Sequence, residues 1–454
     1  MEDRRTRSDS VVARRIQQRR RQRKKKTIIN LTILAIVVIA LIIGIVWGVR
    51  AWIGAVSGPS QPVNAVQTPA PPSAEEIIRQ ADFLAAGYDY DAAIEKIKSY
   101  GPDYAEKPEL TEAISRYEAT KATMVRHEDV TDITHVFFHT LIVDPAKAFD
   151  GDTRETGYNQ YMTTISEFNK MLEEMYARGY VLVDIHDIAR EEVQGDGTTK
   201  FVPGDIMLPE GKKPFVMSQD DVSYYGYMTG DGFASRLVIG DDGYPTNEYV
   251  QDDGTVVRGD FDLVPLLERF IQKHPDFSYK GARATLALTG YDGVLGYRTC
   301  PTADDYKESD IAEAKKVADR MKELGWTFAS HSWGHKLYGS ASAAKLAEDA
   351  KKWDEQVRPI VGDTDVLIYA HGEDIAGIGK YSGEKFETLK SHGFKYFCNV
   401  DSAKAWVQIH DDYVRQGRRN LDGYRMWHNP ELLEDLFVVD DVWDKTRPTP
   451  VPPI

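Results

Sequence analysis

The chain has 454 residues and a net charge of −15, and it contains only two cysteines. Two cysteines in so long a chain exclude a fold that depends on several disulfides. A single disulfide between Cys300 and Cys398 is left open by the sequence. Residues 1–26 carry twelve basic and three acidic side chains, a net charge of +9, so the rest of the chain carries −24. This acidic balance argues against nucleic acid as a partner and favours solubility.

The N-terminal 50 residues predict a membrane anchor. A basic tail, 1–26, precedes a transmembrane signal anchor at 27–50, whose uncharged core of about 22 residues is long enough to cross a bilayer as a helix. The run is longer than that of a cleavable signal peptide, which makes cleavage the less favoured alternative. By the positive-inside rule the N-terminus is cytoplasmic, so we expect a single-pass cell-membrane protein whose main domain is extracellular.

Two segments follow the span. Residues 51–73 are rich in Pro and Ser and predict a semi-extended linker. Residues 74–128 show helical periodicity, and within them Ala81 to Ala93 resembles a helical hairpin of the tetratricopeptide type. A helical spacer packed against the next domain is the favoured interpretation, and a module that docks a protein partner is the alternative.

From residue 129 to 446, short apolar runs alternate with amphipathic segments of helix length. Strands are expected at 134–139, 181–183, 215–217, 284–288, 326–328, 366–369 and 396–397, and helices at 165–178, 263–273, 309–324, 341–359 and 383–392. Such alternation is typical of an α/β protein with a parallel sheet or barrel. Residues 223–260 interrupt the pattern and predict a β-hairpin insertion, either a lid or a decorative loop, and residues 447–454 form a Pro-rich tail.

Two polar motifs come directly after predicted strands. Asp220 and Asp221 end the run at 215–217, and His331 and His335 follow the run at 326–328. Each motif alone is weak, since an Asp pair is usually a turn and two histidines four apart are usually surface residues. Together they provide a carboxylate and two imidazoles, a minimal set for a divalent metal with an open position, and a spare carboxylate that can act as a base.

In this order the motifs resemble those of the polysaccharide deacetylase (NodB-like carbohydrate esterase) family, which run TFDDG and H[ST]xxH. The likeness spans residues 130–400 and is greater to the branch that deacetylates poly-N-acetylglucosamine. Phe138 to Leu141 matches the YHxI strand of that branch, and Tyr369 to Gly372 matches its third motif. The fold that this resemblance implies is a distorted (β/α) barrel deacetylase domain, preceded by the transmembrane helix and the small helical hairpin.

The resemblance also implies roles for the motif residues. Asp221, His331 and His335 would bind one divalent metal, and Asp220 would be the general base. Zinc is the first candidate for the metal, and cobalt, nickel or ferrous iron suit the same ligands. The implied reaction is removal of N-acetyl groups from amino sugars of a cell-wall or extracellular polysaccharide.

Further roles follow by the same resemblance. His139, in the YHxI-like strand, would be the general acid, with His428 as a fallback. Tyr369, His371 and Trp333 are candidates to contact a sugar, with core packing as the alternative for each. The remaining histidines carry no motif and are interpreted as structural or exposed: His127, His135, His186, His274, His392 and His410.

The chain departs from the family pattern beside the Asp pair. Ser218 and Gln219 replace Thr and Phe, Val222 replaces Gly, and His371 replaces a Tyr, while the Arg of the commoner RPPY third motif is absent. These changes leave open a non-catalytic carbohydrate-binding envelope protein with a degenerate deacetylase fold. A related metal hydrolase that cleaves another amide or ester linkage is a third interpretation.

Overall fold

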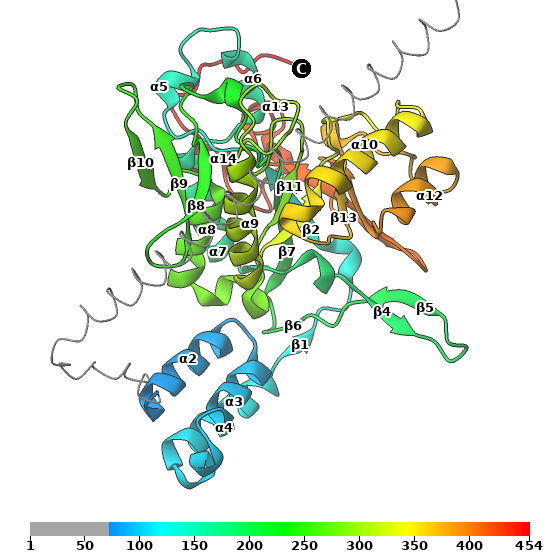
Figure 1. Ribbon diagram of the computed structural model, residues 1–454. Helices are drawn as coiled ribbons and strands as arrows, with labels where there is room; N and C mark the ends of the chain where they lie inside the picture. The colour runs from blue at the N-terminus through cyan, green and yellow to red at the C-terminus, as the bar shows by residue number, and fades with distance from the viewer. Residues whose placement is uncertain (1–71) are drawn as a thin grey trace, which may run out of the picture. The chain divides into compact units, whose positions relative to one another are not determined.

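Seven parallel strands of the described chain, residues 72–454, close into a barrel in this computed structural model (Figure 1). The order around the ring is β7, β11, β12, β13, β14, β16 and β2, and pairing of β11 with β7 closes it. Their bounds are β2 Thr134–Phe138, β7 Lys213–Gln219, β11 Thr285–Leu288, β12 Thr327–Ser330, β13 Val366–Ile368, β14 Tyr396–Val400 and β16 Val414–Asn420. β3 (Tyr180–Leu182) adds to β7 outside the ring, and β15 (Val407–Ile409) runs antiparallel to β16. The predicted distorted barrel is confirmed.

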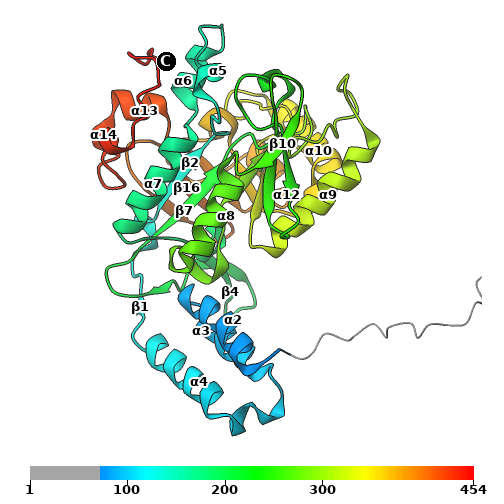
Figure 2. The ribbon, with the colours of Figure 1, turned by 90° about the vertical axis from the view of Figure 1, so that its left-hand side faces the viewer.

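Helices lie on the outer side of this barrel, as α7, α8 and α9 show in Figure 2. The longer ones are α7 Ile165–Ala177, α8 Leu263–Lys273, α9 Glu308–Glu323, α10 Ala343–Gln356 and α12 Glu384–Ser391. α7 begins at a capping box, in which Thr164 and Glu167 each accept a hydrogen bond from the other's backbone N–H. Its buried face includes Phe168, whose ring meets that of Phe138 on β2 edge-on at 5.0 Å between centroids. The helical periodicity of the sequence therefore marks the faces that cover the barrel.

Residues on each barrel strand alternate between the helix-covered side and the barrel interior. Phe215 and Met217 belong to the core cluster shared with the helices, whereas Val216 belongs to a second, inner cluster. With a period of two, Ser218 and Asp220 share the inner side with Val216. The interior of the barrel therefore becomes polar toward the C-terminal ends of its strands.

Three helices occupy the segment in which a hairpin was predicted: α2 Ala74–Ala86, α3 Tyr90–Lys98 and α4 Pro108–Lys121. Ile77 and Ile97 share the inner core cluster with Val216 of β7. The backbone N–H of Lys280 also donates to the carbonyl oxygen of Gly87 at 2.6 Å. The helices and the barrel therefore form one compact unit, Pro72–Ile454.

Shorter elements complete the described chain. The expected insertion is a three-stranded antiparallel sheet, β8 Arg236–Ile239, β9 Pro245–Val250 and β10 Val256–Gly259. The remaining strands are β1 Val125–Arg126, β6 Met207–Leu208, β4 Ala189–Val193 and β5 Thr199–Pro203, and the remaining α-helices are α5 Pro145–Ala148, α6 Glu155–Tyr161, α11 Arg358–Val361, α13 Gly423–His428 and α14 Val439–Val442. In the Pro-rich tail, Arg447 forms a fully buried ion pair with Glu167 of α7. Cys300 and Cys398 are both buried free thiols, so the pairing that the sequence left open does not form.

The predicted basic tail, transmembrane anchor and nearly all of the linker lie outside the described residues. Within residues 72–454, no helix combines the length and the hydrophobicity needed to cross a membrane.

Candidate active site

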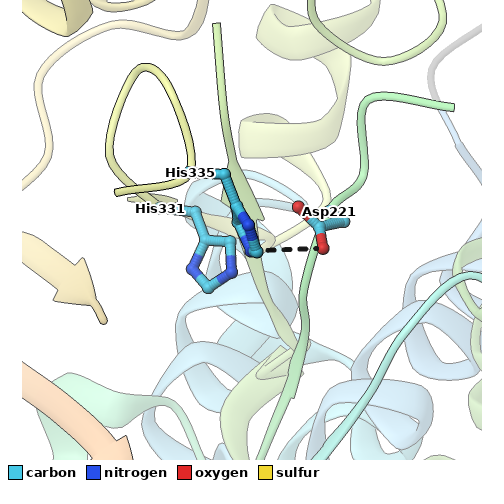
Figure 3. Close-up of side chains that lie close together, drawn as sticks. All are labelled: Asp221, His331 and His335. Atoms are coloured by element: carbon cyan, nitrogen blue, oxygen red, sulfur yellow. Dashed lines mark ion pairs between the residues drawn. The ribbon is translucent and has the colours of Figure 1, made fainter. Parts of the chain in front are cut away.

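The Asp and His motifs meet at one mouth of the barrel. Asp221 follows β7, and His331 and His335 lie on the loop after β12. One ligand atom from each of these three residues lies within 4.8 Å of the other two, and Figure 3 shows the side chains turned toward one another. They meet because parallel strands end at the same edge of a barrel. One carboxylate oxygen and two imidazole nitrogens fit a divalent metal and leave coordination positions open.

The surroundings orient each of these ligands. The Nδ1 of His331 lies 2.9 Å from the carbonyl oxygen of Ile368, which can only accept, so Nδ1 carries the proton and Nε2 is free to bind a metal. The Nε2 of His335 lies 3.7 Å from Asp221, and burial lowers the pKa of His335, which favours the neutral, ligating form. The Tyr225 hydroxyl donates to the second oxygen of Asp221 at 2.5 Å. Two neighbours, Ile368 and Tyr225, thus orient His331 and Asp221 for a metal.

Backbone strain is concentrated around the same site. Of the eight non-glycine residues with positive φ in residues 72–454, four lie here: Asp221, Ser332, His335 and His371. The left-handed region is costly for such residues, and structures keep them there mainly at ligand-binding and active sites. The strain therefore supports a functional role for this mouth of the barrel.

Asp220 lies beside the three ligands but is engaged differently. The Arg418 guanidinium, from β16, donates Nη1 to Asp220 Oδ1 at 2.7 Å and Nη2 to Oδ2 at 2.9 Å. Both side chains are buried, with 0% and 4% of their surfaces exposed. Burial alone would raise the pKa of Asp220, but the charge and hydrogen bonds of Arg418, together with the nearby His331 and His139, outweigh it and hold that pKa well below its ordinary value. Asp220 is therefore an ionised carboxylate kept apart from the ligand set.

The sequence interpretation missed Arg418. This arginine, from the last barrel strand, pairs with Asp220. Residues 414–420 have no apolar periodicity, so no strand was predicted there. The cluster Arg415, Arg418 and Arg419 was the available signal, but it reads equally well as a solvated surface.

A cleft of about 660 Å³ opens above the ligands. Besides the metal-ligand set and Asp220 it is lined by His139, His371 and Asp422, among others. The Nδ1 of His139 contacts the carbonyl oxygen of Tyr161 at 3.1 Å, so Nδ1 donates and Nε2 is the nitrogen left for a substrate. The predicted acid, base and metal ligands therefore share one cleft.

Two of the three predicted sugar contacts lie elsewhere. Tyr369 is 1% exposed, and its hydroxyl donates to the Tyr381 hydroxyl at 3.1 Å inside the core, so its ring cannot meet an external ligand. Trp333 donates its indole N–H to Gln356, and the Lys352 ammonium covers its ring at 4.9 Å. Tyr369 is packed in the core, and Trp333 is partly buried against it. Only His371 lines the cleft, where its ring lies 4.2 Å from that of His335.

Gln219 and Val222, the residues beside the Asp pair that differ from the motif, have their side chains away from the cleft. The Gln219 amide donates to both oxygens of the buried Asp262 carboxylate at 2.9 Å. Val222 is fully buried in the core cluster that the helices share. These substitutions therefore change the packing behind β7 and leave the ligand set in place.

No family model matches the chain, and no curated protein matches it. Among solved structures, the chain is similar to the deacetylase PplD of Streptococcus pyogenes in complex with acetate, with 15% identity, coverage of 69% of this chain and 99% of that chain, and a TM-score of 0.37. It is also similar to the BpsB deacetylase domain of Bordetella bronchiseptica, with 13% identity, coverage of 65% and 97%, and a TM-score of 0.34. At this level of similarity, an activity has to be inferred from the chain's own residues.

Proposed function

We propose that this protein is a metal-dependent deacetylase that hydrolyses N-acetyl groups of amino sugars in a cell-surface or exported polysaccharide. One observation carries the proposal: a three-residue ligand set with open positions lies beside an ionised carboxylate that is not itself a ligand. This division between metal ligands and base supplies a Lewis acid and a proton acceptor, which together support hydrolysis of an amide by water. Action outside the cell, from an anchor at residues 27–50, is part of the proposal and rests on sequence alone.

The base in this reaction is Asp220. Each of its oxygens accepts from Arg418 and keeps a further lone pair, which can take a proton from the attacking water. A carboxylate with so low a pKa is a weak base, so the water must be acidified from another source. Lewis-acid chemistry, which acidifies water and stabilises negative charge on the acyl oxygen, is what a divalent cation at Asp221, His331 and His335 supplies when bound.

His139 completes the reaction as the general acid. Water oxygen bonds to the acetyl carbon, the carbon–nitrogen bond breaks, and the nitrogen leaves as an amine after it takes a proton from Nε2 of His139. Acetate and a free amino sugar are the products. Asp422 lines the same cleft, and its burial raises the pKa of its carboxyl.

Acetate release from the metal-loaded, full-length protein tests this function. The panel consists of N-acetylglucosamine oligomers, peptidoglycan and an O-acetylated glycan. Asp220→Asn is expected to bind metal normally and lose turnover, whereas His331→Ala loses stoichiometric metal. His127→Ala, at a histidine paired with Asp132 outside the cleft, is the matched control and retains both properties.

Each alternative has its own outcome in this panel. Release from the O-acetylated glycan alone would replace the proposal with an esterase. Stoichiometric metal without acetate from any substrate would replace it with a non-catalytic carbohydrate-binding protein. Normal turnover by Asp220→Asn would remove Asp220 as the base.

A further inference from the structure

A histidine that belongs to no motif lies inside the barrel, beneath the cleft. His135 of β2 is fully buried, and both of its ring nitrogens have partners. Nδ1 lies 3.0 Å from Gln416 Oε1, and Nε2 lies 2.9 Å from Ser218 Oγ. The direction of these two hydrogen bonds determines the protonation state of the ring, and the groups at either end fix that direction.

At one end, the chain of hydrogen bonds begins at a backbone carbonyl. The Gln416 side-chain amide lies 3.0 Å from the carbonyl oxygen of Ile133, which can only accept, so the amide nitrogen faces it. The Oε1 of Gln416 therefore faces His135, and this oxygen also can only accept. The proton on His135 must then sit on Nδ1.

At the other end, the chain is fixed by the guanidinium of Arg418, which can only donate. Its Nη1 donates to Ser218 Oγ at 3.1 Å as well as to Asp220. Since the serine oxygen accepts from Arg418, its own proton is free to point to Nε2 of His135 when that nitrogen is bare. The Gln416 end places a proton on Nδ1, and the Arg418 end is satisfied by a bare Nε2, which together describe a neutral imidazole protonated on Nδ1.

The electrostatic surroundings agree with this assignment. Burial, with a further contribution from the charge of Arg418, lowers the pKa of His135 to about 3. A protonated ring would place a second cation next to Arg418 and leave the serine hydroxyl hydrogen without its acceptor. The hydrogen bond to Gln416 and the charge of Asp220 act in the opposite direction, but burial and Arg418 outweigh them and the ring stays neutral.

This hydrogen-bond chain matters for the site because Arg418 has few other restraints. Within residues 72–454, its side chain donates only to Asp220 and Ser218, and its Nε has no partner. The guanidinium also lies over the Phe137 ring at 4.2 Å. Besides the Asp220 carboxylate itself, Ser218 is therefore the hydrogen-bond acceptor that helps to hold Arg418 in place.

We propose that His135 is a positioning residue: its Nδ1-protonated tautomer turns the Ser218 hydroxyl so that the serine oxygen holds Arg418, and through it the Asp220 carboxylate, in register with the metal ligands. The effect on turnover rests on the proposed function. The tautomer itself does not, because it rests on the hydrogen-bond partners and the burial of the ring.

The tautomer can be measured without any catalysis. In full-length protein labelled with ¹⁵N-histidine, the His135 ring, assigned by its loss in a His135→Gln variant, is expected to show a protonated Nδ1 and a bare Nε2. This pattern should not change between pH 5 and pH 9. A ring protonated on Nε2, or one that titrates in this interval, overturns the proposal whether or not the protein is a deacetylase.

Two variants of His135 separate positioning from packing. The Oε1 of His135→Gln can take the place of Nε2 and still accept from Ser218, whereas the shorter His135→Asn reaches only the Nδ1 position. His135→Asn loses the hydrogen bond from the Ser218 hydroxyl, so its kcat is expected to fall about tenfold. His135→Gln keeps that bond, so its kcat is expected to stay within about threefold of the wild-type value. KM and metal content are expected to stay unchanged in both variants.

Ser218→Ala should lower kcat by the same factor, and adding His135→Asn to it should cause no further loss, because both act through one chain. If the losses in kcat of Ser218→Ala and His135→Asn multiply in the double variant, or if His135→Gln and His135→Asn lose equally, His135 has a packing role and the proposal is overturned. If the wild type releases no acetate, the proposed function fails and the tautomer measurement still decides this inference.

Discussion

Replacing Arg418 with methionine removes the permanently charged partner of Asp220 while keeping similar volume. The remaining carboxylate is then buried without a counter-charge. Breaking a buried ion pair from one side costs about 3–5 kcal/mol, and exposed fractions of 0% and 4% leave no solvent to screen the pair. We therefore expect Arg418→Met to be among the most destabilising single changes near the site.

The expected shift in melting temperature follows from the size of the described unit, Pro72–Ile454. An unfolding entropy of about 2.1 cal/mol/K per residue amounts to about 0.8 kcal/mol/K for this unit, so a loss of about 3–5 kcal/mol lowers Tm by about 4–6 °C. The exposed pair of Arg116 and Asp82 provides a control, since Arg116→Met should lower Tm by less than about 1 °C.

The pH dependence has a defined sign. In the wild type, Arg418 depresses the pKa of Asp220, so this pair stabilises the fold above the ordinary carboxyl pKa, and the contribution is lost as the pH falls through the depressed value. In Arg418→Met, burial raises the pKa of Asp220, so the deficit in Tm is greatest at neutral pH and shrinks in acid. The assay is a series of thermal melts of the full-length proteins, with Asp220→Asn/Arg418→Met expected to be more stable than Arg418→Met. An unchanged Tm for Arg418→Met at pH 7 would refute the reasoning.

Three further predictions concern histidines. His331→Ala should abolish stoichiometric zinc or cobalt binding, measured by metal analysis after dialysis, because two of the three ligands cannot hold the ion alone; retained metal would place the site elsewhere. His139→Gln should lower kcat on N-acetylated oligomers by about 10²–10⁴-fold with metal content unchanged, and a normal kcat would exclude it as the acid. Burial disfavours a charged His186, but hydrogen bonds to Asp184 and Asp365 outweigh it and raise its pKa to about 10. Its stabilising contribution is therefore complete below the ordinary histidine pKa and is lost as the pH rises toward 10, so melting curves of wild type and His186→Gln should converge in alkali; a constant gap would contradict this pairing.

The sequence was sufficient for most of the barrel. Runs such as 284–288 and 366–369 are strands because parallel strands covered on both sides are continuously apolar, and the helices between them show their buried faces by period. One strand was missed. β16 is buried along six of its seven residues although it is mostly polar, because its side chains find partners elsewhere in the chain, as Arg418 does 198 residues away at Asp220. Hydrophobic patterning cannot identify such a strand.

The sequence by itself determined which residues meet at the candidate metal site. Asp221, His331 and His335 follow parallel strands, and the C-terminal ends of such strands share one edge. Only the tertiary structure decided what surrounds them: that Arg418 pairs with Asp220, that Tyr369 points into the core, and that His135 lies beneath the site. The physical reason is that strand order and the inward or outward direction of each side chain depend on how the barrel closes, which no local stretch of sequence encodes.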